Sequence, residues 1–386
     1  MTVIRARVRS MQQPWIRGKV ARQAHVAIPA GTVEEEYGRS GFFGGYAHAY
    51  RLHAPVGWVA IEGPLRPRAF DLRRPLPPGQ DDTQRALGRT LFAENEDVRL
   101  HAVRLAATPT FWLRNGDADE LFFVAEGEGW LESMFGVLDF RLHDYVVVPR
   151  GVPYRFGFRS PPRLFCVEAF RGFGVPKEFI NHRGQLRLDA PYNERDFRGP
   201  DRLLDVPAGK PSPRIVVCRN RYVTMHTYTE WPYDVVGWDG YVWPFALNLH
   251  DYRPKTSTYH LPPTSHCVFE AKGFVVMNFV PRIVDYGADA IPCPYPHSSI
   301  DCDEVLYYAD GDFTSRKGIE KHSVSFHPAG IPHGPHPEKY ERSLGMTRTE
   351  EVAIMVDTFA PLAVTRHGEA LSDRGYHFSW NTRDHL

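Results

Sequence analysis

Two parts of the chain repeat the same order of residues that could do chemistry. Each part has an acid, a glycine after six intervening residues, and later a P-x-G-x-x motif followed by a tyrosine or a histidine. The N-terminal copy has Glu120, Gly127, Pro149, Gly151 and Tyr154. The C-terminal copy has Glu304, Gly311, Pro328, Gly330 and His333. Both halves in the same order indicate a duplicated module. Carboxylates and imidazoles bind metal ions and transfer protons, so the C-terminal copy is the candidate for a metal or catalytic site. The alternative is that Glu304 is a surface strand residue and His333 a loop residue.

The motifs E-x6-G and P-x-G-x-x-H together are typical of the cupin family, and the chain resembles a bicupin. The cupin pattern begins with H-x-H followed by Glu. His297 and Glu304 fit that pattern, with Ser299 in the place of the second histidine. The resemblance therefore implies a metal site made of His297, Glu304 and His333. Two imidazoles and one carboxylate occupy one face of an octahedral metal and leave three positions open, as in non-haem Fe(II) oxygenases. We expect Fe(II), although Mn2+ tolerates the same ligands.

The N-terminal copy lacks these nitrogen ligands. Tyr154 stands at the last position, and Leu113 stands where the other copy has His297. Glu120 is therefore left without imidazole partners. We predict a metal-free cupin-like domain over residues 1–210 and a cupin domain with the metal site over residues 211–386.

A narrower resemblance is to the homogentisate 1,2-dioxygenase family, over most of the chain. It rests on PYPHSSIDCDEV at 294–305, FHPAGIPHGPH at 326–336, AIMVDTFAPLAVTRHG at 353–368 and, in the first half, the segment 120–151. The resemblance implies an Fe(II)-dependent, extradiol-type ring-cleaving dioxygenase. It would use O2 to open the ring of a small aromatic acid, homogentisate, to maleylacetoacetate. It also implies a homo-oligomer, with trimers paired into hexamers.

Further site residues follow from this resemblance. His327, six residues before His333, matches a pocket histidine, and His250 falls near the position of a proposed acid/base histidine. The alternatives are a strand histidine facing solvent for His327 and a polar loop residue for His250. Tyr295 and Phe313 are candidate walls of the substrate pocket.

Two residues depart from the family pattern near the expected ring hydroxyl of the substrate. Ser299 replaces the usual asparagine and Phe313 the usual tyrosine. Each change removes a hydrogen bond of about 0.5–1.5 kcal/mol. The substrate therefore stays open between homogentisate and another hydroxylated aromatic acid, such as a gentisate-like compound. A metal-dependent cupin isomerase and a non-enzymatic bicupin are the alternatives outside this chemistry.

Short strands must position these residues. Among 386 residues there are 32 Gly and 33 Pro, which favours many short elements joined by turns. Runs rich in Val, Phe, Tyr and Ile predict strands; they are 120–126, 144–149, 214–218, 273–280, 304–308, 324–327 and 352–359. Short helices are expected at Thr83–Phe92 and from Lys177 onward. The fold class is an all-β bicupin, with two jelly-roll barrels and short helices.

Composition excludes several other classes of protein. Lys and Arg number 46 and Asp and Glu 46, so bulk charge offers no hold on nucleic acid or an anionic membrane. Five cysteines without a CxxC pair argue against a secreted disulfide scaffold. The longest apolar run, 273–280, is too short to cross a bilayer. We therefore expect a cytoplasmic protein.

Overall fold

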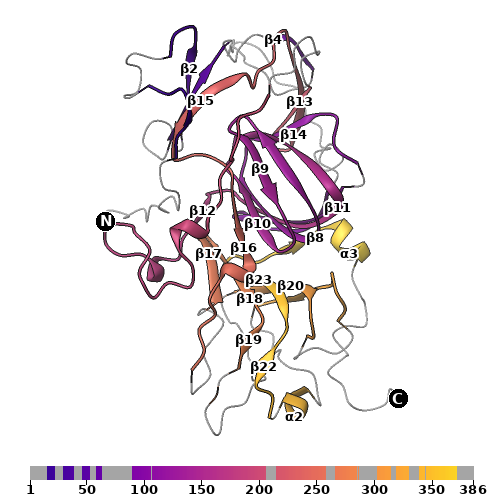
Figure 1. Ribbon diagram of the computed structural model, residues 1–386. Helices are drawn as coiled ribbons and strands as arrows, with labels where there is room; N and C mark the ends of the chain where they lie inside the picture. The colour runs from indigo at the N-terminus through magenta and orange to yellow at the C-terminus, as the bar shows by residue number, and fades with distance from the viewer. Residues whose placement is uncertain are drawn as a thin grey trace, which may run out of the picture.

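Strands form almost all of the regular structure that a computed structural model gives for this chain (Figure 1). The structure describes residues 15–21, 29–38, 46–52, 58–62, 89–105, 107–205, 214–257, 266–284, 286, 302–313, 319–329, 339–343 and 345–371. The prediction of an all-β fold with short helices is confirmed, and all seven predicted strands are present. Within the described residues, no helix is long and apolar enough to cross a membrane.

The larger sheet has twelve strands and is built mainly by the N-terminal half. Its main path runs β16-β10-β8-β11-β7-β13-β14-β4, with β6, β5 and β24 joined in series to β11, and β9 joined to β8. The bounds are β4 Trp58–Glu62, β5 Arg89–Glu94, β6 Val98–Arg104, β7 Trp112–Asn115, β8 Asp119–Ser133, β9 Gly136–Phe140, β10 Asp144–Val148, β11 Pro153–Ala169, β13 Ile215–Arg219, β14 Tyr222–Tyr228, β16 Phe245–Asn248 and β24 Ala363–Val364.

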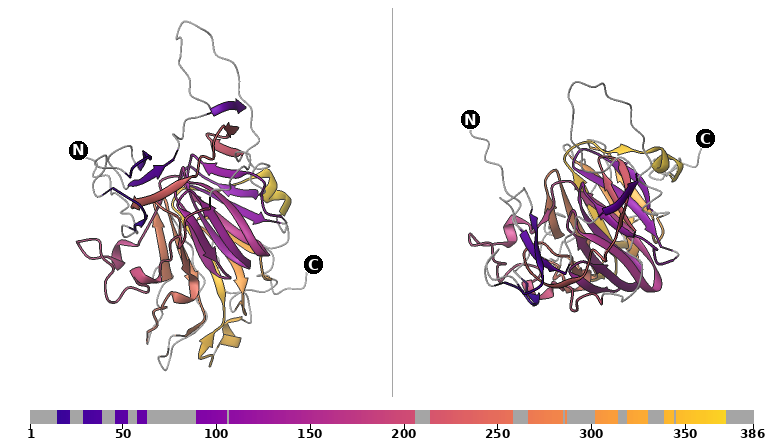
Figure 2. Two further views of the ribbon diagram at one scale, coloured as in Figure 1. Left: turned by 45° about the horizontal axis from the view of Figure 1, so that its top comes forward. Right: turned by 90° about the horizontal axis from the view of Figure 1, so that it is seen from above.

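The second sheet has six strands in the order β12-β17-β18-β23-β20-β21. Its bounds are β12 Phe173–Gly174, β17 Cys267–Ala271, β18 Phe274–Phe279, β20 Asp303–Asp310, β21 Val324–His327 and β23 Val352–Thr358. Figures 1 and 2 show its orange and yellow strands lying against the purple strands of the larger sheet.

The remaining elements are short. A four-stranded sheet has the order β1-β15-β3-β2, and β19 pairs with β22. These strands are β1 Arg17–Gly18, β2 Val33–Gly38, β3 Tyr46–Arg51, β15 Val235–Gly240, β19 Arg282–Ile283 and β22 Arg348–Thr349. The helices are η2 Lys177–Phe179, η3 Glu194–Asp196, η4 Leu249–Asp251, α2 Lys339–Ser343 and α3 Arg366–Leu371.

One predicted helix is wrong over the residues that the structure describes. The sequence predicts a helix over Thr83–Phe92, but β5 begins at Arg89 and its residues alternate between buried and partly buried. β5 pairs with β6 on one side and with β24 on the other. Pairing with strands far along the chain overrides the local helical pattern there.

Hydrogen bonding between strands crosses the predicted boundary at residue 210 in both directions. β13, β14 and β16 belong to the N-terminal sheet, and β24 from the end of the chain pairs with β5. In the other direction, β12 pairs with β17 of the C-terminal sheet. The division into 1–210 and 211–386 therefore stays a prediction.

The two faces of β20 have different roles. Its odd-numbered residues face the larger sheet, where the ring of Tyr307 lies 4.9 Å from that of Phe165 and 6.4 Å from that of Phe123. Its even-numbered residues face the opposite way, and Leu306 and Tyr308 belong to a separate small apolar cluster. Because alternate residues of a strand share a face, Glu304 lies on the side of this second cluster.

Strand register confirms the duplicated module. Glu120 pairs across the sheet with Val148 and Glu168. Glu304 pairs in the same way with His327 and Asp357.

The aspartate before each of these glutamates supports the turn of the P-x-G motif. Asp119 Oδ1 accepts a hydrogen bond from the backbone N–H of Arg150 at 2.8 Å. Asp303 Oδ1 accepts one from the N–H of Ala329 at 2.6 Å. The two aspartates therefore hold the turns.

The motif glycine after β20 should resist substitution. Gly311 has φ +81°, and a Cβ there would overlap the carbonyl oxygen of Glu350. We expect Gly311→Ala to lower the free energy of unfolding by about 2–5 kcal/mol, from left-handed backbone strain plus overpacking. Gly151 has φ +84° with open space around it, so Gly151→Ala should cost only about 1–2 kcal/mol. Urea unfolding of both variants would measure this; equal losses would contradict it.

Candidate functional site

The predicted acid of the C-terminal copy is buried beside a histidine. Glu304 on β20 is 5% exposed and His327 on β21 is 4% exposed. Their Cα atoms are paired across the two strands, and His327 Nδ1 lies 2.8 Å from Glu304 Oε1. An ionised carboxylate only accepts hydrogen bonds, so Nδ1 carries the proton and Nε2 is the basic nitrogen. The alternative of a solvent-facing His327 is therefore excluded.

Four other predicted residues lie outside the described part of the chain. They are the ligands His297 and His333 and the pocket residues Tyr295 and Ser299. Within the described residues, no group of three or more His, Cys, Asp and Glu side chains could hold a metal ion. The predicted metal site therefore stays a prediction. The described part of the predicted site fits iron. Glu304 is a buried carboxylate with an imidazole against it, and Fe(II) accepts ligands of both kinds.

Phe313 lies on the same side of the C-terminal sheet as Glu304. Its ring is 4.9 Å from that of Tyr308 in a T-shaped contact, and it packs against the small cluster that contains Leu306. The hydroxyl of Tyr308 is bonded to Ser325 Oγ at 3.1 Å. Phe313 therefore adds an apolar surface on this side, and its role as a wall of the substrate pocket stays a prediction.

His250 forms a pair with His143. His143 Nδ1 and His250 Nε2 are 2.8 Å apart, and the charges of Asp310 and Lys321 act on His143. His327, on the strand next to β20, is the predicted histidine that the structure places against the acid. Whether His250 acts as the acid/base residue stays a prediction.

In the N-terminal copy a guanidinium takes the place of a metal. Arg89 Nη2 lies 2.5 Å from Glu120 Oε1, and Arg89 Nη1 lies 3.1 Å from Glu168 Oε1. All three side chains are at least 95% buried. Asn115 Nδ2 donates to Glu168 Oε1 at 3.0 Å, and His101 Nε2 lies 3.4 Å from Glu168 Oε2. One cation therefore sits between two carboxylates on neighbouring strands.

Burial decides how this cluster is charged. It raises the pKa of Glu120, and the nearby charge of Glu168 adds to that effect. Burial opposes ionisation of Glu168 as well, but His101 and Arg89 outweigh it and lower the pKa of Glu168 to about 2. Glu168 is therefore the ionised partner of Arg89, and Glu120 is the acid that takes up a proton first.

Sequence reasoning missed two residues of this arrangement. Arg89 lies in the segment predicted as a helix, so nothing placed it beside Glu120. Asp357 stands opposite Glu304 in the register, where the other copy has Glu168 opposite Glu120. The signal for Asp357 was available, because the strand 352–359 was predicted and could have been aligned with the strand that ends the first copy.

Comparisons with known proteins show what this chain is similar to. Residues 97–249 match a family model described as "Homogentisate 1,2-dioxygenase N-terminal". A Saccharolobus solfataricus protein provisionally named a dioxygenase is 37% identical over 76% of this chain and 76% of its own length. The homogentisate 1,2-dioxygenase of Rhodopseudomonas palustris is 25% identical over 69% of this chain and 62% of its own. The chain thus spans about three fifths of that enzyme.

Solved structures were also matched, and one of them is described as a cupin barrel. It is a "Cupin 2 conserved barrel domain protein" from Leptotrichia buccalis, 11% identical, with a TM-score of 0.32 over 70% of this chain and 87% of that one.

The cation of the N-terminal copy should be essential for stability. Arg89→Met would leave Glu168 buried without its partner, and we expect a loss of about 3–5 kcal/mol in the free energy of unfolding. The control is Arg163→Met, because Arg163 pairs with Glu126 at 2.9 Å where the side chains are 30% and 44% exposed. That surface pair should contribute no more than about 1 kcal/mol. Equal losses of unfolding free energy in the two variants, measured by chemical denaturation, would show that the buried cluster contributes no more to stability than a surface ion pair.

The histidine pair should make the fold sensitive to acid. Burial, with the charge of His250, lowers the pKa of His143 to about 4 from 6.5. The unfolded chain then binds a proton between these values that the folded protein does not, so stability is lost as the pH falls through this window. The loss is at most about 3 kcal/mol, and smaller because solvent reaches exposed His250.

The variant His143→Asn tests this titration. Asparagine tolerates the φ of +64° at this position and does not titrate. The difference in urea midpoint between pH 7 and pH 4.5 should shrink in this variant. An unchanged difference would mean that other groups cause the acid sensitivity.

Proposed function

Because the chain belongs to the homogentisate 1,2-dioxygenase family, we propose that it is an Fe(II)-dependent dioxygenase that opens the ring of a small dihydroxylated aromatic acid. Homogentisate, giving maleylacetoacetate, is the first substrate to test. The observation that carries the proposal is the buried pair of Glu304 and His327 on neighbouring strands. In the sequence, the segment that contains His297 precedes β20, and the segment that contains His333 follows β21.

The proposed iron ligands are His297, Glu304 and His333. Bound Fe(II) would supply open positions at which an aromatic diol and O2 meet and exchange electrons. Glu304 brings its negative charge from a rigid strand whose other face is packed into the main core. His327 fixes the orientation of this carboxylate through Nδ1, as residues behind a metal ligand commonly do.

Proton transfer is assigned to His327. It lies against Glu304, and a histidine there can accept a phenolic proton and later return one. His250 is the second candidate for this role, but its Nε2 is engaged with His143. The position of His327 beside the proposed ligand favours it.

One observation supports a second substrate class. Phe313 offers an apolar edge where relatives in the family usually have a tyrosine hydroxyl, and Ser299 is shorter than the usual asparagine. These two departures are the reason to test another dihydroxylated aromatic acid, such as gentisate, beside homogentisate. We also propose that the protein acts as a homo-oligomer, a trimer or a pair of trimers, as the family resemblance implies.

Oxygen uptake with purified protein tests the proposal. After anaerobic loading with Fe(II), we expect uptake on adding homogentisate or gentisate, and a new absorbance from the opened ring. Glu304→Gln should lower kcat/KM by more than about 100-fold, beyond the 10–100-fold typical of residues that only support a ligand.

Asp310→Asn is the matched control, because Asp310 lies at the other end of β20 in an exposed pair with Lys321. It should leave oxygen uptake unchanged. Uptake with gentisate alone would move the assignment to the second substrate class. Absence of uptake with every hydroxylated acid by iron-loaded protein would overturn the proposed activity.

A further inference from the structure

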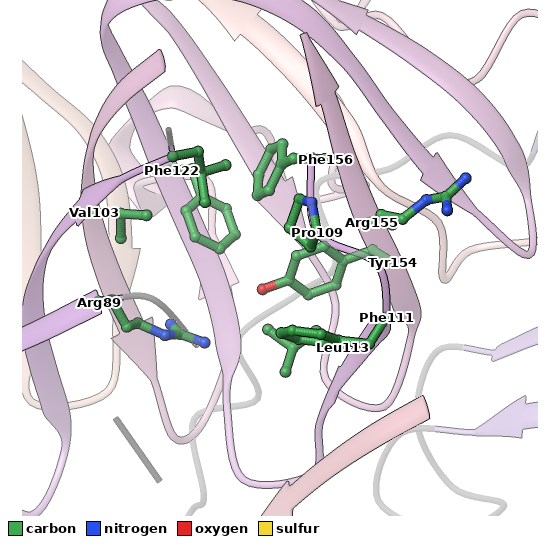
Figure 3. Close-up of a pocket in the computed structure, with 10 residues that line it drawn as sticks. Arg89, Val103, Pro109, Phe111, Leu113, Phe122, Tyr154, Arg155 and Phe156 are labelled. Carbon is green, nitrogen blue, oxygen red and sulfur yellow. The ribbon is translucent and has the colours of Figure 1, made fainter. Parts of the chain in front are cut away.

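The cavity of the N-terminal barrel is too small for the substrate that the proposed function requires. It has about 40 Å³ of free space beside Arg89 and Tyr154 (Figure 3), which holds a few water molecules at about 10–15 Å³ each. The rings of Phe122 and Phe156 in its wall touch edge to face, with centroids 5.1 Å apart. An aromatic acid has no room in this cavity, so the groups that hold its carboxylate are expected in the C-terminal copy.

Aromatic side chains form an apolar surface at one end of the C-terminal sheet. Phe279, Ala353 and Tyr308 stand in one row across β18, β23 and β20. Phe279 and Phe313 pack against the same small cluster that contains Tyr308. Tyr308 lies four residues beyond Glu304 on the same face of β20. The aromatic surface therefore extends from the proposed iron ligand toward the end of the sheet.

Two cations flank this aromatic surface. The guanidinium of Arg282 on β19 lies over the ring of Phe279, with its carbon 5.7 Å from the ring centroid. Lys339, the first residue of α2, donates from Nζ to the carbonyl oxygen of Phe313 at 3.4 Å. Figure 1 shows β19 and α2 at the same lower end of the C-terminal sheet. Positive charge is therefore placed beside apolar rings where the sheet ends.

Both cations have donors that a ligand can use. The ammonium of Lys339 carries three N–H donors. Within the described residues it makes one hydrogen bond, to Phe313, and no ion pair. The guanidinium of Arg282 carries five N–H donors in a planar fork, so it can bind a carboxylate beside its other contacts.

A buried hydroxyl next to Arg282 also points to a ligand. Thr349 on β22 is 6% exposed, and its Oγ1 has no hydrogen-bond partner in the part of the chain that the structure describes. Arg282 and Thr349 are paired directly across β19 and β22, so their side chains lie on one face of this two-stranded ribbon. A carboxylate oxygen bound there would satisfy the hydroxyl and the guanidinium together.

Resting on the proposed function, we propose that Arg282 and Lys339 bind the carboxylate of the aromatic acid. Thr349 donates a further hydrogen bond, and the ring lies along the aromatic surface with its hydroxyls toward Glu304. A carboxylate beside apolar rings is costly unless it is paired with a cation. These two side chains therefore select an acid over the same ring without a negative charge.

Anaerobic calorimetric titration of the iron-loaded full chain with homogentisate tests this proposal. Arg282→Met and Lys339→Met should each raise the Kd at least about tenfold, and Lys339→Arg, which keeps the charge, should retain most of the affinity. The methyl ester of homogentisate should bind the parent at least about tenfold more weakly than the acid does, and both methionine variants should bind it as the parent does. Melting curves and iron analysis show that each variant is folded and loaded.

Arg348→Met is the matched control. Arg348 stands next to Thr349 on β22, but it pairs with Glu350 and lies opposite Ile283, on the other face of the ribbon. Its loss removes the same charge from the same strand pair, and the variant should bind homogentisate as the parent does.

The outcomes separate this inference from the proposed function. Unchanged homogentisate binding in both methionine variants, or an equal loss of affinity for the ester, would overturn the inference, whereas oxygen uptake by the parent would still support the activity. Weaker binding of the acid alone in both variants, without oxygen uptake by the parent, would support the inference and overturn the activity. If the parent binds neither homogentisate nor gentisate, both are overturned.

Discussion

A carboxylate buried under a sheet needs a positive partner, and this need organises both halves of the molecule. Glu120 and Glu304 hold equivalent positions in the register and are 1% and 5% exposed. An unpaired charge in such a place would cost several kcal/mol. In the N-terminal half the cation is Arg89, which lies 2.5 Å from Glu120 and 3.1 Å from the ionised Glu168. In the C-terminal half the imidazole of His327 lies against Glu304, and the proposed function assigns the positive charge to iron. The same kind of core thus holds the side chain of Arg89 as its cation in one copy and, as proposed, an iron ion in the other.

The strands that carry these acids use their two faces for different purposes. The odd-numbered side of β20 is joined to the larger sheet through Tyr307, whose ring stacks on Phe165. The even-numbered side carries Glu304 and the apolar surface shared with Phe313. Because the first face is fixed by packing between the sheets, the second face holds its side chains in a constant geometry. That is what a metal ligand and a substrate wall require. The exchange of short strands between the halves, β12 in one direction and β24 in the other, ties both copies into one unit.

The sequence was sufficient to find the repeat, the strands and the acid of each copy, because these depend on short-range patterns. A run of strand-forming residues identified the strand that starts at Glu304, and the E-x6-G motif marked Gly311 just beyond its end. The sequence patterns could not predict which distant strands pair with one another. Residues 89–94 form a strand only because β6 and β24 lie beside them, so the partner of Glu120 could not be recognised. His250 was proposed from the family resemblance alone. Its contact with His143 joins positions 107 residues apart, and no local pattern predicts such a contact. Asp357 could have been found by extending the repeat through its last strand.

Iron content of matched variants tests most directly the claim that the two copies meet the same electrostatic need in different ways. Wild-type protein, Glu120→Gln and Glu304→Gln would be loaded with Fe(II) without oxygen, desalted and analysed for metal. The account predicts one iron per chain in the wild-type protein and in Glu120→Gln, and almost none in Glu304→Gln. Equal iron content in all three proteins, or loss of iron in Glu120→Gln alone, would contradict it.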